Sequence, residues 1–164
     1  GKRFLNLFSY TGSFTVYAAT GGAISSETVD LSNTYLDWAK RNFELNGMDL
    51  AAHRIVRADV FQYLDEAAQQ GKQFDLMVLD PPSFSNSKKM LDILDIQRDQ
   101  AKLVDGAMRL LAPQGTLYFS NNLRSFTLDS ALAERYRIKD ISRFSVPEDF
   151  RNRQIHQCWE IGHL

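Results

Sequence analysis

The sequence predicts an α/β fold in which a mostly parallel sheet carries helices on both faces. Segments with strand character alternate five times with segments of helical periodicity, which is typical of parallel strands joined by crossover helices. The segment Phe74–Leu79 is a continuous apolar run that ends on Asp80, as expected of a central strand buried on both faces. The expected architecture is a doubly wound, Rossmann-like sheet of about seven strands, with an antiparallel pair at its C-terminal end.

The first half of the chain supplies four of these strands. We expect strands over residues 4–8, 23–30, 53–58 and 74–79, and helices over residues 13–20, 32–46 and 60–68. Ser32 is suited to cap the second helix, whose buried face would carry Leu36, Ala39 and Phe43. Glycines follow all three helices and predict where they end.

The second half begins with a proline pair that stops the fourth strand. A polar loop is expected over residues 83–95, a helix over 96–111 and a fifth strand over 115–121. A short helix over 128–135 precedes strands over 138–145 and 157–161. These last two strands are separated by a loop instead of a helix, and they predict the antiparallel pair.

The bulk composition limits the class of protein. With 164 residues, 44% of them hydrophobic, the chain suits one globular domain, and a net charge of −1 means that any nucleic-acid-binding surface must be local. Cys158 is the only cysteine and the three histidines have no ligand spacing, so no disulfide framework or metal site is expected. No apolar run reaches the roughly 20 residues of a membrane span, and no signal peptide is visible, which favours a cytoplasmic protein. Because the first strand starts so near Gly1, we expect a fragment of a longer polypeptide whose upstream domains are absent.

The N-terminal segment is expected to form the centre of a ligand site. The first strand runs into a short turn, Ser9-Tyr10-Thr11-Gly12, and a helix begins near Ser13. Such a turn presents backbone N–H groups to a ligand. A dinucleotide site requires G-x-G-x-x-G, because a pyrophosphate must approach bare backbone. Gly12 is the turn's single glycine, which favours a ligand with an amino acid in place of phosphates, as in S-adenosylmethionine.

Acidic residues follow three of the strands, at the edge of the sheet where ligands bind. Asp30 lies about 20 residues beyond the turn, where a ribose diol would lie if adenosine occupied the site. Asp59 is placed to accept from an adenine amino group, with Val60 and Phe61 as apolar walls. Any one of these acids is equally well explained as a turn former or helix cap, but their order along the strands favours a nucleoside site.

The segment that follows the fourth strand is suited to hold a nucleobase. Asp80-Pro81-Pro82 is stiff, the proline carbonyls are potential acceptors for a base edge, and Phe84 is suited to stack on a flat ring. The alternative is a proline-rich strand terminator with Phe84 in the core. Asn121 and Asn122, after the fifth strand, are either hydrogen-bonding partners of the base or turn residues.

Seven segments together resemble a known family: FSYTGSF, TVDLS, WAKRNFELNG, RADVF, DPPSFSNSK, FSNN and DFRNRQIHQCW. They resemble the C-terminal, 7-methylguanosine-forming half of the bifunctional bacterial 23S rRNA guanine methyltransferases, within the class I S-adenosylmethionine-dependent methyltransferases. The resemblance implies methyl transfer to guanosine N7 in 23S rRNA. It places the methionine part of the cofactor near Ser9, Tyr10, Thr11 and Gly12, the ribose near Asp30 and Leu31, and the adenine near Asp59. It also implies that Asp80 lies near the transferring methyl group, beside Pro81, Pro82, Phe84 and Asn121 as catalytic-site residues.

Three alternatives remain open at this point. The related rRNA 5-methylcytosine enzymes keep a nucleophilic cysteine within FSCS, where this chain has Phe119-Ser120-Asn121-Asn122. Guanine N7 already has an in-plane lone pair and loses no proton, so a site without a nucleophile suits it. The other two are a nicotinamide-dependent oxidoreductase on the same fold and a non-catalytic RNA-binding module.

Basic residues in two late loops are candidates for rRNA contacts. Lys88 and Lys89 follow the proline pair, and Arg151 and Arg153 lie in the loop before the last strand. Together they would form a basic rim that binds phosphates; the alternative is a pair of solvated loops. His156 is expected to be a structural hydrogen-bonding residue, since N7 transfer has no proton to move.

Overall fold

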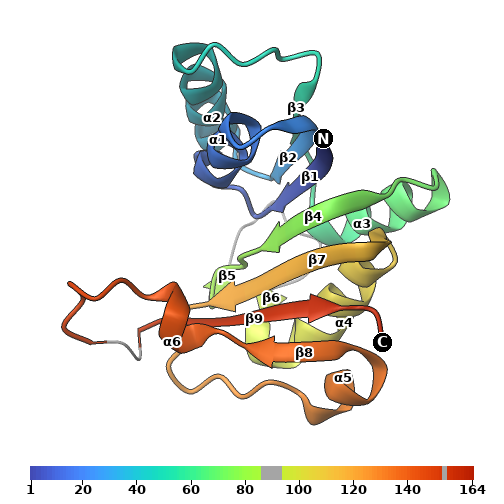
Figure 1. Cartoon of the computed structure of the whole chain (residues 1–164), viewed down its shortest axis with the longest axis vertical. Coiled ribbons are helices and arrows are strands. Elements are labelled where there is room, and N and C mark those ends of the chain that lie inside the picture. The colour runs from blue at the N-terminus through green and yellow to red at the C-terminus, as the bar shows by residue number, and fades with distance from the viewer. Residues whose placement is uncertain (86–93, 153–154) are drawn as a thin grey trace.

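The computed structural model describes residues 1–85, 94–152 and 155–164 (Figure 1). The first half contains β1 (Lys2–Leu7), α1 (Ser13–Thr20), β2 (Ala23–Asp30), α2 (Asn33–Leu45), β3 (His53–Arg57), α3 (Val60–Gln69) and β4 (Phe74–Leu79). The second half contains β5 (Phe84–Ser85), β6 (Leu94–Asp95), α4 (Ile96–Met108), β7 (Leu111–Asn121), α5 (Ser130–Arg135), β8 (Arg137–Asp140), α6 (Ser142–Ser145) and β9 (Gln157–Gly162).

Seven strands form one sheet in the order β3-β2-β1-β4-β7-β9-β8. The five strands from β3 to β7 are parallel, and β9 pairs antiparallel with both β7 and β8. The predicted doubly wound α/β fold with an antiparallel C-terminal pair is therefore confirmed. The strand order reverses between β1 and β4, so the crevice beyond their carboxyl ends is where this topology binds ligands.

The helices divide between the two faces of the sheet. Helices α1 and α2 cover one face over β1–β3, whereas α3 and α4 cover the other face behind β4 and β7 (Figure 1). The side chains of β1 alternate between these two faces. Leu5 and Leu7 are fully buried in the main core with α3 and α4, whereas the Asn6 amide, on the opposite face, donates to Thr15 of α1 at 3.2 Å. The core thus fixes the edge of the sheet from which the acidic residues emerge.

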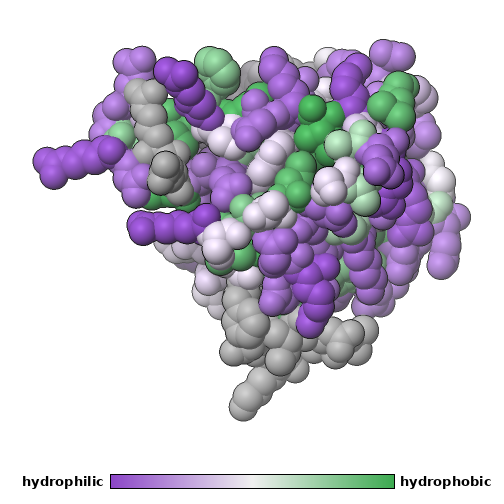
Figure 2. Space-filling model, turned by 90° about the horizontal axis from the view of Figure 1, so that it is seen from below, coloured by the Kyte–Doolittle hydropathy of each residue, from purple (hydrophilic) through white to green (hydrophobic). Residues whose placement is uncertain are grey.

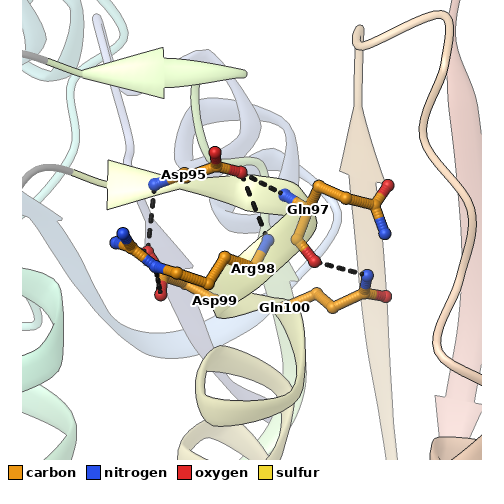
Figure 3. A network of polar contacts seen from close by, with 5 residues as sticks. All are labelled: Asp95, Gln97, Arg98, Asp99 and Gln100. Atoms are coloured by element: carbon orange, nitrogen blue, oxygen red, sulfur yellow. Dashed lines mark hydrogen bonds and ion pairs between the residues drawn. The ribbon is translucent and has the colours of Figure 1, made fainter.

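The predicted cap of α2 agrees with the structure, and α4 has a cap that the sequence analysis did not predict. The Ser32 hydroxyl accepts from the Tyr35 N–H at 3.4 Å, and the predicted apolar face of α2 is buried. At α4, the Asp95 carboxylate accepts from the backbone N–H groups of Gln97 and Arg98 (Figure 3). In return, the backbone N–H of Asp95 donates to the Asp99 carboxylate. This reciprocal cap fixes where the chain that leaves the proline pair re-enters a helix.

Several predicted bounds differ from the structure by one or two residues, and three predictions differ more clearly. The strand predicted over residues 138–145 ends at Asp140, because the Asp140 carboxylate accepts from the Ser142 N–H at 2.8 Å and turns the chain into α6. The helix predicted to end at residue 111 ends at Met108, and β7 already begins at Leu111, which pairs with Phe74. The loop predicted over residues 83–95 contains the short antiparallel pair β5–β6.

The surface seen from below is mainly hydrophilic, with smaller hydrophobic areas between the polar side chains (Figure 2). Ion pairs on the helices, such as Arg135 with Asp105 at 2.7 Å, are of the exposed kind that contributes little stability. In the described part of the chain, no helix is long and apolar enough to cross a membrane.

Candidate active site

A cavity of about 580 Å³ opens at the carboxyl ends of the parallel strands. Its lining comes from the segments that follow β1, β2, β3, β4 and β7: Phe8, Tyr10, Asp30, Leu31, Ser32, Tyr35, Ala58, Asp59, Val60, Asp80, Pro81, Pro82, Ser83 and Asn122. All three predicted acids are therefore brought to one cavity. Among the predicted residues, Tyr10, Leu31, Val60, Pro81 and Pro82 also line it.

The turn after β1 has an unusual backbone. Phe8 and Tyr10 have positive φ angles of 56° and 50°, and Gly12 follows with a φ of 74°. For residues with large side chains this left-handed conformation is uncommon and strained, and such strain is concentrated at functional sites. Two hydrogen bonds to the end of β2 hold the turn: the Ser9 N–H donates to the Val29 carbonyl at 3.0 Å, and the Tyr10 N–H donates to the Asp30 carboxylate at 3.0 Å.

Three residues of this turn that were predicted to bind the cofactor do not line the cavity. Ser9 and Thr11 are buried, and the Ser9 hydroxyl has no hydrogen-bond partner within the described residues. Gly12 faces α2, where an added Cβ would lie 2.9 Å from Phe43 Cε1 and 3.0 Å from the Ala39 Cβ. The glycine therefore allows α2 to pack against the turn, and the Asn42 amide reinforces that packing by donating to the Thr11 carbonyl at 2.9 Å.

Gly12→Ala is expected to destabilise the fold by about 2–4 kcal/mol, from the left-handed φ and from the overpacking against α2. Gly47→Ala is the matched control, because Gly47 has a φ of 64° but nothing within 4 Å of its added Cβ. Urea unfolding of both variants measures the difference. Equal loss of stability in the two would show that packing against α2 contributes nothing.

Asp30 organises the cavity wall between β2 and α2. One carboxylate oxygen accepts from the Ser32 N–H at 2.9 Å, and the other accepts from the Tyr10 N–H at 3.0 Å. A carboxylate offers about four acceptor positions, so two remain for a ligand diol. Tyr35 also lines the cavity, with its ring edge-on to that of Tyr10 at a centroid distance of 4.5 Å. Sequence reasoning missed Tyr35, although its place in the first turn after the Ser32 cap was a usable signal.

Asp59 caps α3 and also lines the cavity. Its Oδ1 accepts from the N–H groups of Phe61 at 2.9 Å and Gln62 at 3.3 Å, while Oδ2 accepts no hydrogen bond within the described residues. The cap and the ligand-binding interpretations of Asp59 are thus compatible. Phe61 does not line the cavity: it packs against the core, with the Lys102 ammonium 4.6 Å from its ring centroid.

Asp80 is a cavity acid whose pKa is clearly shifted by its surroundings. Burial raises the pKa of its carboxyl group, and a hydrogen bond from the Ser120 hydroxyl at 2.7 Å and the nearby His156 oppose that rise. Ser120 lies on β7 beside β4, so neighbouring strands place the pair. The backbone of Phe84 pairs in β5, while its side chain lies outside what the structure describes.

Asn121, the last residue of β7, and Asn122, the residue after it, have different surroundings. Asn121 is fully buried, its side-chain oxygen accepts from the Leu123 N–H at 3.0 Å, and it does not line the cavity; that it borders the reacting base stays a prediction. Asn122 lines the cavity instead. Its side-chain oxygen lies 3.0 Å from His156 Nδ1, which agrees with the structural role predicted for His156.

The predicted basic rim is described only in part. Arg151 is exposed in the loop before β9, whereas Lys88, Lys89 and Arg153 lie outside the described residues. Within the described ranges, no cluster of histidine, cysteine or acidic side chains has the arrangement of a metal site.

The fold and the cavity together define a class of α/β enzymes. These enzymes bind a nucleoside-type ligand where the strand order reverses, through acids at the ends of neighbouring strands and a turn with one glycine. The chain belongs to the S-adenosylmethionine-dependent methyltransferase family, whose model matches residues 1–154.

Curated relatives and solved structures agree with this family. The chain is 77% identical to the ribosomal RNA large subunit methyltransferase K of Neisseria meningitidis over 99% of its own length and 46% of the relative's. It is 55% identical to the ribosomal RNA large subunit methyltransferase K/L of Saccharophagus degradans, covering 99% of this chain and 21% of that one. The chain thus spans less than half the length of these relatives. The methyltransferase SMU.776, complexed with SAH, is 29% identical with a TM-score of 0.79, over 98% of this chain and 45% of that one.

The residues around the cavity fit the family's cofactor. A volume of about 580 Å³ lies within the range of small-molecule sites. Three carboxylates, Asp30, Asp59 and Asp80, line it. S-adenosylmethionine carries an ammonium, a sulfonium and no phosphate, so an acidic cavity beside a turn with one glycine suits it better than a dinucleotide.

Proposed function

We propose that this chain transfers a methyl group from S-adenosylmethionine to N7 of a guanosine in 23S rRNA. The observation that carries the proposal is the single cavity that joins the three acids to the Asp80-Pro81-Pro82 segment and Asn122. The names of the curated relatives, which are methyltransferases of large-subunit ribosomal RNA, support the class of substrate. The sequence resemblance supports guanine N7 as the acceptor.

The cofactor would be held by side chains from three strand ends. Asp30 would accept from the ribose hydroxyls, with Leu31 beside it, and Asp59 would accept from the adenine amino group through its Oδ2. Tyr10 would lie along the methionine part, and Asp80 would balance its positive charge. When bound, S-adenosylmethionine supplies an electrophilic methyl group on a sulfonium.

The acceptor side requires orientation more than proton transfer. Guanine N7 attacks through an existing lone pair, so the chain's residues must hold the ring with N7 about 3–3.5 Å from the methyl carbon and in line with the breaking bond. Pro81, Pro82 and Asn122 line the cavity beside Asp80 and would supply acceptors and a donor to the base edge. Water exclusion by the proline pair would strengthen these hydrogen bonds.

The position of Cys158 bears on the 5-methylcytosine alternative. Cys158 is buried on β9, directly opposite Ser120, the residue that donates to Asp80. Burial, with smaller contributions from Asp80 and Asp140, raises the pKa of its thiol to about 11. Because the thiolate is the nucleophile, a thiol held protonated at neutral pH is a poor one for attack on cytosine C6.

Cys158→Ser is therefore expected to keep methyl transfer within about threefold of the wild type, since the hydroxyl fits the same space. Initial rates with labelled S-adenosylmethionine and 23S rRNA measure this. Loss of activity together with a trapped covalent adduct on 5-fluorocytosine RNA in the wild type would instead establish the cytosine mechanism.

The direct test of the proposal uses the intact protein, unmodified 23S rRNA and S-adenosylmethionine, followed by mass mapping of the nucleosides formed. We expect 7-methylguanosine. Formation of 5-methylcytosine, or of no methylated nucleoside, would contradict the proposal. Calorimetric titration with S-adenosylmethionine and with NADH, run in parallel, tests the oxidoreductase alternative.

A further inference from the structure

The segment from α6 to Asn152, residues 142–152, forms an arm that projects from the body of the molecule beyond the carboxyl end of β7 (Figure 1). It exposes two large aromatic side chains: Phe144 is 84% exposed and Phe150 is 48% exposed. Neither belongs to the main core. The two side chains lie six residues apart on one arm and are largely uncovered by the fold, so both are available to a binding partner.

The base of the arm is firmly attached to the sheet. The Ser142 hydroxyl accepts from the Cys158 N–H at 3.0 Å, and it is 3.4 Å from the Cys158 carbonyl oxygen, to which it donates. Val146, between the two phenylalanines in sequence, is buried. The direction in which the arm leaves the sheet is thus set by β9.

The attachment point of the arm lies near the acceptor side of the cavity, because Ser142 contacts Cys158, which pairs opposite Ser120, the residue that donates to Asp80. Strand β9 starts at Gln157, which pairs with Asn121 at the carboxyl end of β7. His156, just before β9, contacts Asn122, and Asn122 lines the cavity with Asp80. The arm therefore begins at the edge where the proposed target base would enter.

The chemistry of the arm suits single-stranded RNA better than a protein surface. Each exposed phenylalanine is adjacent in sequence to an exposed arginine, Arg143 next to Phe144 and Arg151 next to Phe150. An aromatic ring paired with a cation matches the alternation of base and phosphate in an unpaired strand. The exposed acids between the pairs, Glu148 and Asp149, are unlike the core of a protein–protein interface, where charged residues are depleted. Because they would repel phosphates, any phosphate contact must be made by the arginines on either side of them.

We propose that Phe144 and Phe150 stack on unpaired bases next to the target nucleotide, while Arg143 and Arg151 contact the flanking phosphates. The inference rests on the proposed function for the identity of the RNA, but its core, an RNA-stacking arm beside the cavity, is measured by binding alone. It assigns to this arm the part of RNA recognition that lies closest to the reacting base.

The test measures binding of a single-stranded 12-nucleotide RNA with one 2-aminopurine to the intact protein saturated with S-adenosylmethionine. Phe144→Ala and Phe150→Ala are each expected to raise the Kd about 5- to 100-fold and to reduce the 2-aminopurine quenching that reports stacking. Phe150→Trp should retain both. Arg143→Gln and Arg151→Gln should each lower the slope of log Kd against log salt by about 0.7, whereas the alanine variants leave that slope unchanged.

Tyr17→Ala is the matched control, because Tyr17 is an aromatic residue 78% exposed on α1, outside the arm and outside the cavity lining. It should change neither RNA affinity nor quenching, and all variants should bind S-adenosylmethionine as the wild type does. A Phe144→Ala/Phe150→Ala double variant that binds the probe within twofold of the wild type would overturn the inference. The same holds if the double variant keeps its affinity for the probe but no longer self-associates, which would make the arm a contact between copies of the chain.

Failure of this inference and failure of the proposed function give different results. If the wild type forms no 7-methylguanosine but RNA affinity depends on the two phenylalanines, the arm is supported and the N7 reaction is not. If 7-methylguanosine forms and the double variant binds the probe and methylates 23S rRNA as the wild type does, only the arm is refuted.

Discussion

Asp80→Asn is expected to lower kcat/KM for methyl transfer about 100-fold or more, equivalent to about 2.7 kcal/mol, while leaving the protein at least as stable as the wild type at neutral pH. The loss follows from removing the negative charge that would face the positively charged methionine part of the cofactor. The variant is expected to keep its folding stability because asparagine still accepts the hydrogen bond from Ser120 and places no charge in the protein interior.

The pH dependence of stability has a definite sign. Burial raises the pKa of Asp80 in the folded state above its unfolded value, so in the window between the two values the native protein binds more protons than the unfolded chain. The stability that Asp80 contributes is full below the unfolded pKa and is lost as pH rises through the folded pKa. Urea unfolding between pH 4 and 7 should show this loss in the wild type and not in Asp80→Asn.

Asp37→Asn on the exposed side of α2 is the control for both measurements, because it removes the same charge outside the cavity lining. A variant Asp80→Asn that methylates rRNA normally, or that unfolds more readily than Asp37→Asn at pH 7, would contradict the role given to Asp80.

Asp30→Ala is expected to raise the Kd for S-adenosylmethionine about 100-fold or more. The substitution removes an acceptor for the ribose hydroxyls, where each hydrogen bond to a charged group contributes about 1.5–3 kcal/mol. It also leaves the N–H groups of Tyr10 and Ser32 without their partner, which loosens the turn after β1. Isothermal titration measures the change, with Asp37→Ala as the matched control; unchanged affinity in Asp30→Ala would refute the ribose assignment.

Much of this fold could be predicted from the sequence because the local signals agree with the tertiary packing. The bounds of α1, β2 and β4 are those that the sequence predicts, since apolar patterning, glycines and prolines mark both ends of each. The convergence of the three acids on one cavity follows from the same topology, because each acid lies at or just beyond the carboxyl end of a parallel strand.

The parts that could not be predicted depend on contacts distant in sequence. The positive φ angles of Phe8 and Tyr10 are imposed by pairing with β2 and by the Asp30 carboxylate. Which of Asn121 and Asn122 faces the cavity depends on strand register, where a shift of one residue exchanges the two faces. That a Cβ at Gly12 would meet α2 depends on how closely Phe43 approaches the turn.

The place of β9 in the sheet affects how the chain reaches its native state. Strand β9 is the last of the strands in sequence, yet it lies between β7 and β8, and β8 pairs only with β9 within the described sheet. Trp159 of β9 also completes an aromatic cluster with Phe119 and Phe126. During synthesis, β8 therefore emerges from the ribosome without a pairing partner, and the edge of β7 stays uncovered until β9 arrives. The C-terminal part of the sheet can assemble only after β9 has been made, whereas β1 to β4 can pair earlier in synthesis.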